Sequence, residues 1–197
     1  MEYLESIKNE DIFFLEIGAF DGKSFDGLYK YTHNNNWKGI FVEPINEYFQ
    51  QLQLNFQNIE NKVFENSAIT DENKQYEIKR LKLDKKWAKG SSSLVDNDNN
   101  NKHSYFSETI NGITFDTLVK KYDIQKIDVL QIDTEGYDYR ILKQIIPTFL
   151  PKYIKVEQRH LSYMDKKKIK TLLSECNYEF NRVGLDYICL LKPLEKP

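Results

Sequence analysis

The 197-residue sequence has little cysteine, no long apolar run and no excess of charge of one sign. Its two cysteines, Cys176 and Cys189, match no metal-type spacing and cannot build a disulfide framework, so we expect ordinary thiols in a reducing compartment. No stretch approaches the ~20 apolar residues that cross a bilayer. The N-terminus also lacks the basic start and apolar run of a signal peptide. These absences predict a cytoplasmic protein without a membrane span.

The charge balance disfavours a nucleic-acid partner. Lys and Arg number 28 against 30 Asp and Glu, which gives a formal net charge of −2. Nucleic-acid-binding domains usually carry a basic face, so this balance weakens that function class without excluding it. Hydrophobic residues make up 40% of the chain, enough for a buried core and too many for a disordered tail.

Apolar stretches alternate with amphipathic ones along the chain. Five short apolar runs and a closing hairpin predict seven strands, at residues 12–17, 39–43, 63–69, 128–133, 153–157, 178–183 and 187–191. Helical spacing predicts helices at residues 24–31 (with Ser24 as the N-cap), after a capping Asn46, and at 116–122, 137–146 and 165–176. We therefore expect one Rossmann-like α/β domain over residues 1–197, with helices on both faces of a mostly parallel sheet and a C-terminal antiparallel hairpin.

Residues 72–104 interrupt this alternation. Residues 76–83 alternate like a strand, whereas 84–86 and 96–102 are polar and rich in turn formers. We interpret the segment as an excursion from the core that carries a mobile loop near the active site. Ser91–Ser93 and Asn97–Asn101 offer polar contacts to a hydroxylated acceptor, with an exposed loop as the alternative, which we prefer for residues 99–101.

The first two strands end in residues typical of a nucleotide site. Gly18 and Gly22 allow a tight turn, but their spacing is not the Gly-x-Gly-x-x-Gly that cradles a pyrophosphate. Glu16 is an acid in an otherwise apolar strand. Glu43 ends the next strand, where an acid can accept hydrogen bonds from both ribose hydroxyls. Together these residues favour an adenosyl ligand with a cationic arm over the alternative of a simple turn and a surface acid.

The fourth expected strand ends in two acids. Asp133 and Glu135 leave it just ahead of Gly136, a pattern that folding alone rarely explains. Asp133 is suited to hold an ammonium group or to orient an acceptor hydroxyl, and Glu135 to bind the acceptor or accept its proton. The alternative, first-turn acids favoured by the helix dipole, is accepted here for Asp138.

The fifth expected strand adds a third acid and a histidine. Glu157 ends this strand beside Asp133, so the two carboxylates can converge to bind a divalent cation, share a proton, or pair with Arg159. His160 follows directly and is a candidate general base. Its alternative is a surface or hydrogen-bonding role, which position alone favours.

The ordered set of motifs resembles the FkbM family of S-adenosylmethionine-dependent methyltransferases. Residues 16–22 resemble its first motif, 37–44 its second, 91–94 a serine-rich loop, 132–136 its Asp-x-Glu-Gly signature and 154–157 its following strand. The resemblance runs in order from about residue 12 to about residue 191. The first motif alone is unspecific, whereas the ordered set is fairly specific.

The resemblance implies S-adenosylmethionine as cofactor and methylation of a hydroxyl, often on a sugar of a glycan or glycosylated metabolite. Residues expected at the cofactor are Glu16, Gly18, Ala19, Asp21, Gly22, Ser24, Glu43, Pro44, Ser67, Ala68 and Asp133. Catalytic roles for Asp133, Glu135, Glu157 and His160 are our own inference, with Asp133 and Glu157 as ligands if a cation takes part. The chain is short for the family, so we expect an acceptor site that is open or completed by a second subunit in a homodimer.

Three other functions stay open. A dinucleotide-dependent oxidoreductase is disfavoured because the pyrophosphate motif is missing. A methyltransferase-like module that binds a nucleotide without turnover would share the same cofactor residues. A methylase acting on nucleic acid is disfavoured by the acidic balance and the lack of a basic stripe.

Overall fold

A computed structural model describes residues 2–34, 36–81, 92–93 and 105–193. Its main sheet has seven strands, in the order β10 (Tyr178–Val183), β11 (Asp186–Leu191), β9 (Tyr153–Glu157), β8 (Val129–Ile132), β1 (Phe13–Ile17), β2 (Lys38–Val42) and β3 (Lys62–Glu65). The strands from β9 to β3 pair in parallel, and the hairpin of β10 and β11 joins antiparallel to β9. The expected mostly parallel sheet with its closing hairpin is confirmed.

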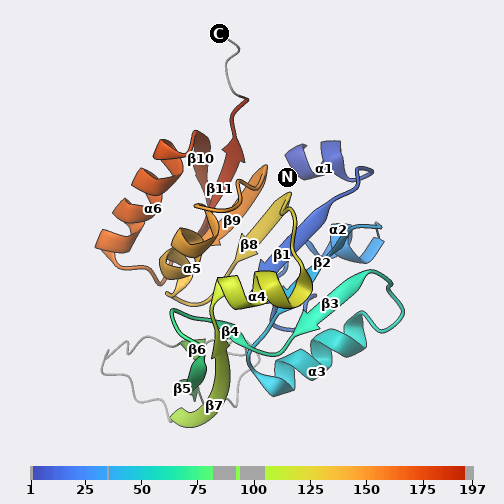
Figure 1. The fold of residues 1–197 in the computed structure, drawn as a ribbon, viewed down its shortest axis with the longest axis vertical. Helices are drawn as coiled ribbons and strands as arrows, with labels where there is room; N and C mark the ends of the chain where they lie inside the picture. Colours follow the sequence, from blue (N-terminus) through green and yellow to red (C-terminus); the bar gives the residue numbers. More distant parts are fainter. Residues whose placement is uncertain (1, 35, 82–91, 94–104, 194–197) are drawn as a thin grey trace.

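Helices cover both faces of this sheet (Figure 1). One face is packed by α4 (Phe115–Tyr122), α5 (Asp138–Ile145) and α6 (Tyr163–Glu175), the other by α1 (Glu2–Ile7), α2 (Tyr29–Asn34) and α3 (Asn46–Asn55). Successive residues of β1 serve opposite cores, since Leu15 belongs to the core that contains Leu142 and Phe14 to the core that contains Phe56. The continuous apolar strands of the sequence are therefore buried on both sides.

A second sheet is inserted between β3 and α4. Its strands run in the order β4 (Ala68–Ile69), β7 (Tyr105–Ile113), β5 (Lys74–Leu81) and β6 (Ser92–Ser93). In Figure 1 it lies at the end of the molecule away from α1 and the end of β11. A small core of Ile45, Ala68, Ile78 and Ile110 joins it to the chain after β2. The expected excursion is thus partly a sheet, while residues 82–91 and 94–104, including Asn97–Asn101, lie outside the described residues.

The helix expected at residues 24–31 begins later, at Tyr29. The carboxylate of Asp21 accepts hydrogen bonds from the backbone N–H groups of Lys23 and Ser24 and from Ser24 Oγ, at 2.6–3.0 Å. Phe25 then takes a left-handed backbone conformation, with φ of 62°. Because this local turn satisfies the polar groups before a helix can form, the prediction of Ser24 as an N-cap is wrong.

Two other boundaries differ from expectation. Asn46 is the first residue of α3, and the capping position is Ile45, so Asn46 is not the cap. The strand expected at 63–69 is divided, because the side chain of Asn66 donates hydrogen bonds to the carbonyls of Glu43 and Pro44, at 2.9 and 3.2 Å. The chain turns there from the main sheet into the second sheet.

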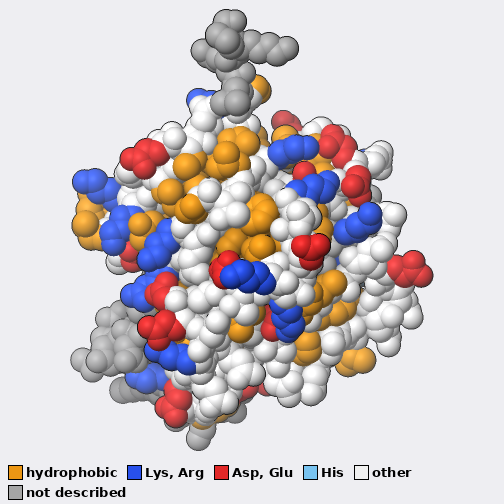
Figure 2. All heavy atoms as spheres, viewed as in Figure 1, with side chains coloured by type: hydrophobic (Ala, Val, Ile, Leu, Met, Phe, Trp, Pro, Cys, Tyr) orange, Lys and Arg blue, Asp and Glu red, His pale blue; other side chains and the backbone are white. Residues whose placement is uncertain are grey.

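The surface is mostly of mixed charge. In Figure 2, lysine and arginine side chains gather along the left edge over α6, which carries Lys166, Lys167, Lys168 and Lys170. These lysines make one side of the molecule locally basic, although the sequence analysis predicted no basic stripe. Within the described part of the chain, no helix has the length and apolar character that crossing a membrane requires.

Candidate active site

A pocket of about 380 Å³ opens at the carboxyl ends of β1, β2 and β8, beside the second sheet. The residues expected at the cofactor that line it are Glu16, Gly18, Ala19, Ser24, Glu43, Pro44, Ser67, Ala68 and Asp133. Two expected residues are not in its wall. Asp21 holds the turn after β1, and Gly22 packs on α3, where an added Cβ would lie 2.4 Å from Leu52 Cδ1. Asp21 and Gly22 therefore shape the turn after β1 and do not line the pocket.

Gly18 brings three strand ends together. It has a φ of +80°, and an added Cβ would lie 1.8 Å from the carbonyl oxygen of Asp133. The N–H groups of Gly18 and Ala19 both donate to the carbonyl of Val42, at 2.9 and 3.1 Å. Only glycine fits this position, because the backbone conformation and the close approach of β8 both exclude a side chain.

Glu43 is held by backbone donors on both carboxylate oxygens. Its Oε2 accepts from the N–H of Phe20 at 2.8 Å, and its Oε1 from the N–H of Ile45 at 2.9 Å. Burial raises the pKa of Glu43 to about 7, although these two hydrogen bonds favour the ionised form. The carboxylate is therefore fixed in place at the pocket wall, and Phe20 is fixed with it at a φ of 53°.

A cluster of buried polar groups lies beneath the pocket. Gln131 donates from Nε2 to Glu16 Oε1 at 3.0 Å and to Asp26 Oδ1 at 2.9 Å. Burial raises the pKa of Glu16 and of Asp26. Within the described structure, Glu16 Oε2, Asp26 Oδ2 and Gln131 Oε1 have no hydrogen-bond partner. All three residues line the pocket, so their free oxygens fit a cationic group such as an ammonium.

Asp26 and Gln131 were missed in the sequence. Gln131 had a usable signal, since it is a polar residue in an apolar strand and lies directly opposite Glu16 in the sheet. Asp26 had none, because it follows an irregular turn that was expected to be helical.

The acid and histidine residues expected at the reacting end do converge. His160 Nε2 lies 2.9 Å from Glu135 Oε2 and 4.0 Å from Glu157 Oε1. The hydrogen bond that His160 donates to the carboxylate of Glu135 raises the pKa of His160. Burial, reinforced by nearby Asp133 and Glu135, raises the pKa of Glu157 to about 9. Asp133 lines the pocket, and burial raises its pKa to about 6.

The loop that carries Glu135 is strained and well braced. Glu135 has a φ of 55°, uncommon for a residue with a side chain. The buried carboxylate of Asp138 accepts from the N–H groups of Thr134 and Gly136, at 3.1 and 3.0 Å. The sequence predicted only that Asp138 complements the helix dipole. In the structure its carboxylate also closes the loop between β8 and α5.

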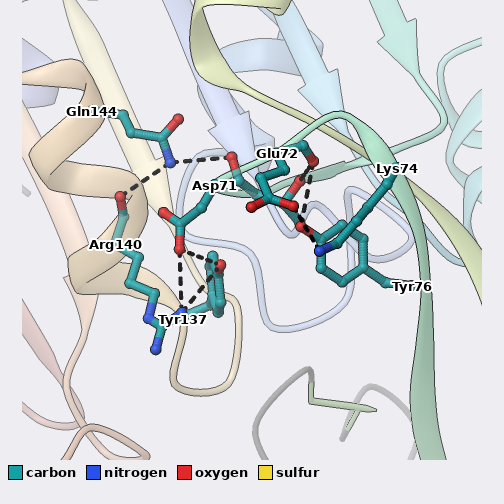
Figure 3. A network of polar contacts seen from close by, with 8 residues as sticks. Asp71, Glu72, Lys74, Tyr76, Tyr137, Arg140 and Gln144 are labelled. Carbon is teal, nitrogen blue, oxygen red and sulfur yellow. Dashed lines mark hydrogen bonds and ion pairs between the residues drawn. The ribbon is translucent and has the colours of Figure 1, made fainter.

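Figure 3 shows how the second sheet is fastened to α5 beside the pocket. Asp71, at the turn after β4, accepts hydrogen bonds from the Tyr137 hydroxyl at 2.9 Å and from Arg140 at 3.2 Å. Gln144 adds a bond to the carbonyl of Thr70 at 3.3 Å. Tyr137 lines the pocket, so this network sets one of its walls.

A family model described as the methyltransferase FkbM domain matches residues 16–180. The chain belongs to this family. The cofactor expected from the sequence, S-adenosylmethionine, is confirmed by this membership. A comparison with curated proteins returned no match.

Solved structures share the fold of this FkbM chain at low sequence identity. A methyltransferase FkbM from Methylobacillus flagellatus KT superposes with a TM-score of 0.58 at 14% identity, covering 93% of this chain and 44% of that one. An rRNA methylase from Streptococcus thermophilus gives 0.53 at 7% identity, with coverage of 98% and 93%. A putative rRNA-methylase from Clostridium thermocellum gives 0.53 at 8%, with coverage of 99% and 96%. The chain thus spans less than half the length of the Methylobacillus protein.

Proposed function

We propose that this chain transfers a methyl group from S-adenosylmethionine to a hydroxyl of a sugar, in a glycan or a glycosylated metabolite. The observation that carries the proposal is the pocket itself, which has fixed acceptors for a nucleoside at one end and Asp133 and Glu135 at the other. The cofactor supplies a methyl group on a positively charged sulfur, whose bonding electrons stay on the sulfur when the group leaves.

At the cofactor end, the assignment follows the arrangement of hydrogen-bond acceptors. Glu43 accepts from the ribose hydroxyls with the oxygen lone pairs that Phe20 and Ile45 leave free. The unpartnered oxygens of Glu16 and Asp26 receive the ammonium of the aminoacyl arm. Ser67 and Ala68 border the adenine.

At the acceptor end, a sugar hydroxyl must lose a proton to become a good nucleophile. Asp133 faces the pocket and accepts this proton, while Glu135 binds the acceptor beside it. His160 lies behind Glu135 at 2.9 Å and positions its carboxylate. Alignment of the acceptor with the methyl group accounts for much of the catalysis, an effect worth up to ~7–11 kcal/mol in well-oriented systems.

Calorimetric titration with S-adenosylhomocysteine tests the cofactor assignment, with NADH as the comparison ligand. We expect saturable binding of the nucleoside and none of NADH. Glu43→Ala should weaken binding about tenfold to a hundredfold, as expected for lost hydrogen bonds to a charged group. Glu60→Ala, an exposed acid after α3, is the matched control. Well-folded protein that binds only NADH would instead be a dinucleotide enzyme.

The acceptor class needs a separate experiment. Labelled methyl transfer from S-adenosylmethionine is measured against a panel of neutral oligosaccharides and against RNA of mixed sequence. We expect incorporation into oligosaccharide that Asp133→Asn abolishes. Incorporation into RNA alone would contradict the sugar assignment while leaving the cofactor assignment intact.

A further inference from the structure

Three side chains of the kinds that bind metal ions meet behind the reacting end of the pocket. Glu135 comes from the loop after β8, Glu157 ends β9, and His160 follows three residues later. One ligand atom from each lies within 4.8 Å of the other two. Asp133, which the sequence suggested as a cation ligand with Glu157, is not part of this group.

The separations suit one coordination sphere. Neighbouring ligands of an octahedral cation with bonds of ~2.1 Å lie roughly 3.0 Å apart, and opposite ligands roughly 4.2 Å apart. His160 Nε2 is 2.9 Å from Glu135 Oε2 and 4.0 Å from Glu157 Oε1. Small side-chain adjustments would therefore place one ion between the three groups.

Glu157 supplies an independent reason to expect a ligand. Its side chain is 8% exposed, and its Oε2 finds no hydrogen-bond partner in the described part of the chain. The charged groups that act on it with the strongest effect are further acids, Asp133, Glu135, Asp138 and Asp186. One of these acids, Asp186, is paired with Lys155 at 3.5 Å. A buried carboxylate oxygen without a partner, among other acids, is poorly stabilised unless it binds a proton or a cation.

We propose that Glu135, Glu157 and His160 bind one divalent cation of the Mn²⁺ or Zn²⁺ type. Two carboxylates with one imidazole suit these ions better than the all-oxygen preference of Mg²⁺ and Ca²⁺. Three protein ligands leave coordination positions open, and one of the three, Glu135, lines the pocket, so an ion held here would lie at the edge of the acceptor end.

The role of the cation rests on the proposed function, whereas its binding does not. A hydroxyl oxygen that coordinates the ion gives up its proton more readily, because the ion stabilises the developing alkoxide. The proton passes to Asp133, the oxygen bonds to the methyl carbon, and the carbon–sulfur bond breaks with its electrons on sulfur. Adjacent hydroxyls of a sugar ring suit two open positions of one ion.

Calorimetry with MnCl₂ and with ZnCl₂ tests the site on the 197-residue chain freed of metal by chelator. We expect one ion per chain for at least one of the two salts. Glu157→Gln and His160→Ala should each raise its Kd at least about tenfold, since even loss of an outer-shell partner costs that much. Glu179→Gln removes the same charge from an exposed site on β10 and should bind as the wild type does.

Folding and cofactor binding are followed in the same samples by circular dichroism and by titration with S-adenosylhomocysteine. A variant that keeps both but loses the ion supports the site. The proposal is overturned if neither salt binds, or if both variants bind as tightly as the wild type. Metal binding without S-adenosylhomocysteine binding would sink the proposed function and leave the site standing.

Discussion

The two ends of the pocket are built on different principles. At the exits of β1 and β2, backbone groups hold every acidic oxygen of Glu43, and Val42 anchors the turn at Gly18. At the exits of β8 and β9, the carboxylates of Glu135 and Glu157 meet a histidine and other acids. Glu43 and the turn at Gly18 are thus held in place by backbone groups alone, whereas the acids of the second end are held by one another and by a histidine. In the proposed function, the first of these arrangements positions the cofactor and the second serves the acceptor.

The largest difference between the two ends should appear on adding one methyl group. Gly18→Ala would place its Cβ 1.8 Å from a backbone oxygen at a φ of +80°, so strands must move apart. We expect a loss of at least ~3 kcal/mol in the free energy of unfolding, or no folded protein. Gly136→Ala, whose Cβ would lie 3.4 Å from the nearest atom, should cost about 1–3 kcal/mol from backbone strain alone.

Urea unfolding measures both variants, and Gly184→Ala is their control. Gly184 has a φ of +62°, and among the described residues other than its chain neighbours no atom lies within 4 Å of an added Cβ. Its alanine variant therefore measures backbone strain without a clash, about 1–2 kcal/mol. If Gly18→Ala and Gly184→Ala lost the same free energy of unfolding, the turn after β1 would tolerate a side chain as well as a surface turn does. The proposed difference between the two ends of the pocket would then be wrong.

The second effect is a pH dependence carried by Glu43. Its pKa is raised from 4.5 to about 7 by burial. Below pH 4.5 the carboxyl is protonated in the folded and unfolded states, and above about 7 it is ionised in both. Because the folded state binds more protons between these values, stability falls as pH rises through this window. Glu43→Gln should therefore make the free energy of unfolding decrease less steeply between pH 4.5 and about 7.

The measurement is the free energy of unfolding of ligand-free protein at several values from pH 4.5 to 7.5. Other buried acids contribute the same trend, so the informative quantity is the difference between wild type and variant. A difference that stays constant with pH would mean that Glu43 ionises normally and is not held by burial as described.

The smallest expected effect on the free energy of unfolding comes from the hydrogen bonds that join the second sheet to α5. Tyr137→Phe keeps the ring in the pocket wall but removes the hydroxyl that donates to Asp71 at 2.9 Å. We expect a loss of about 1 kcal/mol and faster amide exchange in β4 and β5. Arg140→Ala removes a more exposed ion pair and should cost less, about 0.2–1 kcal/mol. The reverse order would make the ion pair the main fastening.

The sequence predicted the main sheet well because short strand-like segments alternate along the chain with stretches of helical spacing. Residues 153–157 and 178–183 were expected as strands with the bounds that the structure has. Where polar side chains compete with backbone hydrogen bonding, prediction failed. Asp21 delays α2 and Asn66 divides the third strand, and neither effect follows from hydrophobic spacing.

The site was partly predictable for the same reason. Acids at strand ends stand out, so Glu16, Glu43 and Asp133 could be placed at the pocket from their positions. Whether carboxylates converge depends on loop geometry, which put His160 against Glu135 and left Asp133 outside that group. The second sheet was predicted only in part, because residues 76–83 alternate like a strand whereas no strand was expected at residues 105–113, with which β5 pairs.

The short ladder between β4 and β7 has a consequence for how such an enzyme diversifies. Ala68 pairs with Gly112 and Ile69 with Ile113, so the segment between them leaves and rejoins the scaffold at neighbouring points. A closed excursion of this kind can be lengthened or exchanged at little entropic cost and without moving the main sheet. The fold thus combines a fixed parallel sheet with an inserted segment whose length can change without altering the register of the seven main strands.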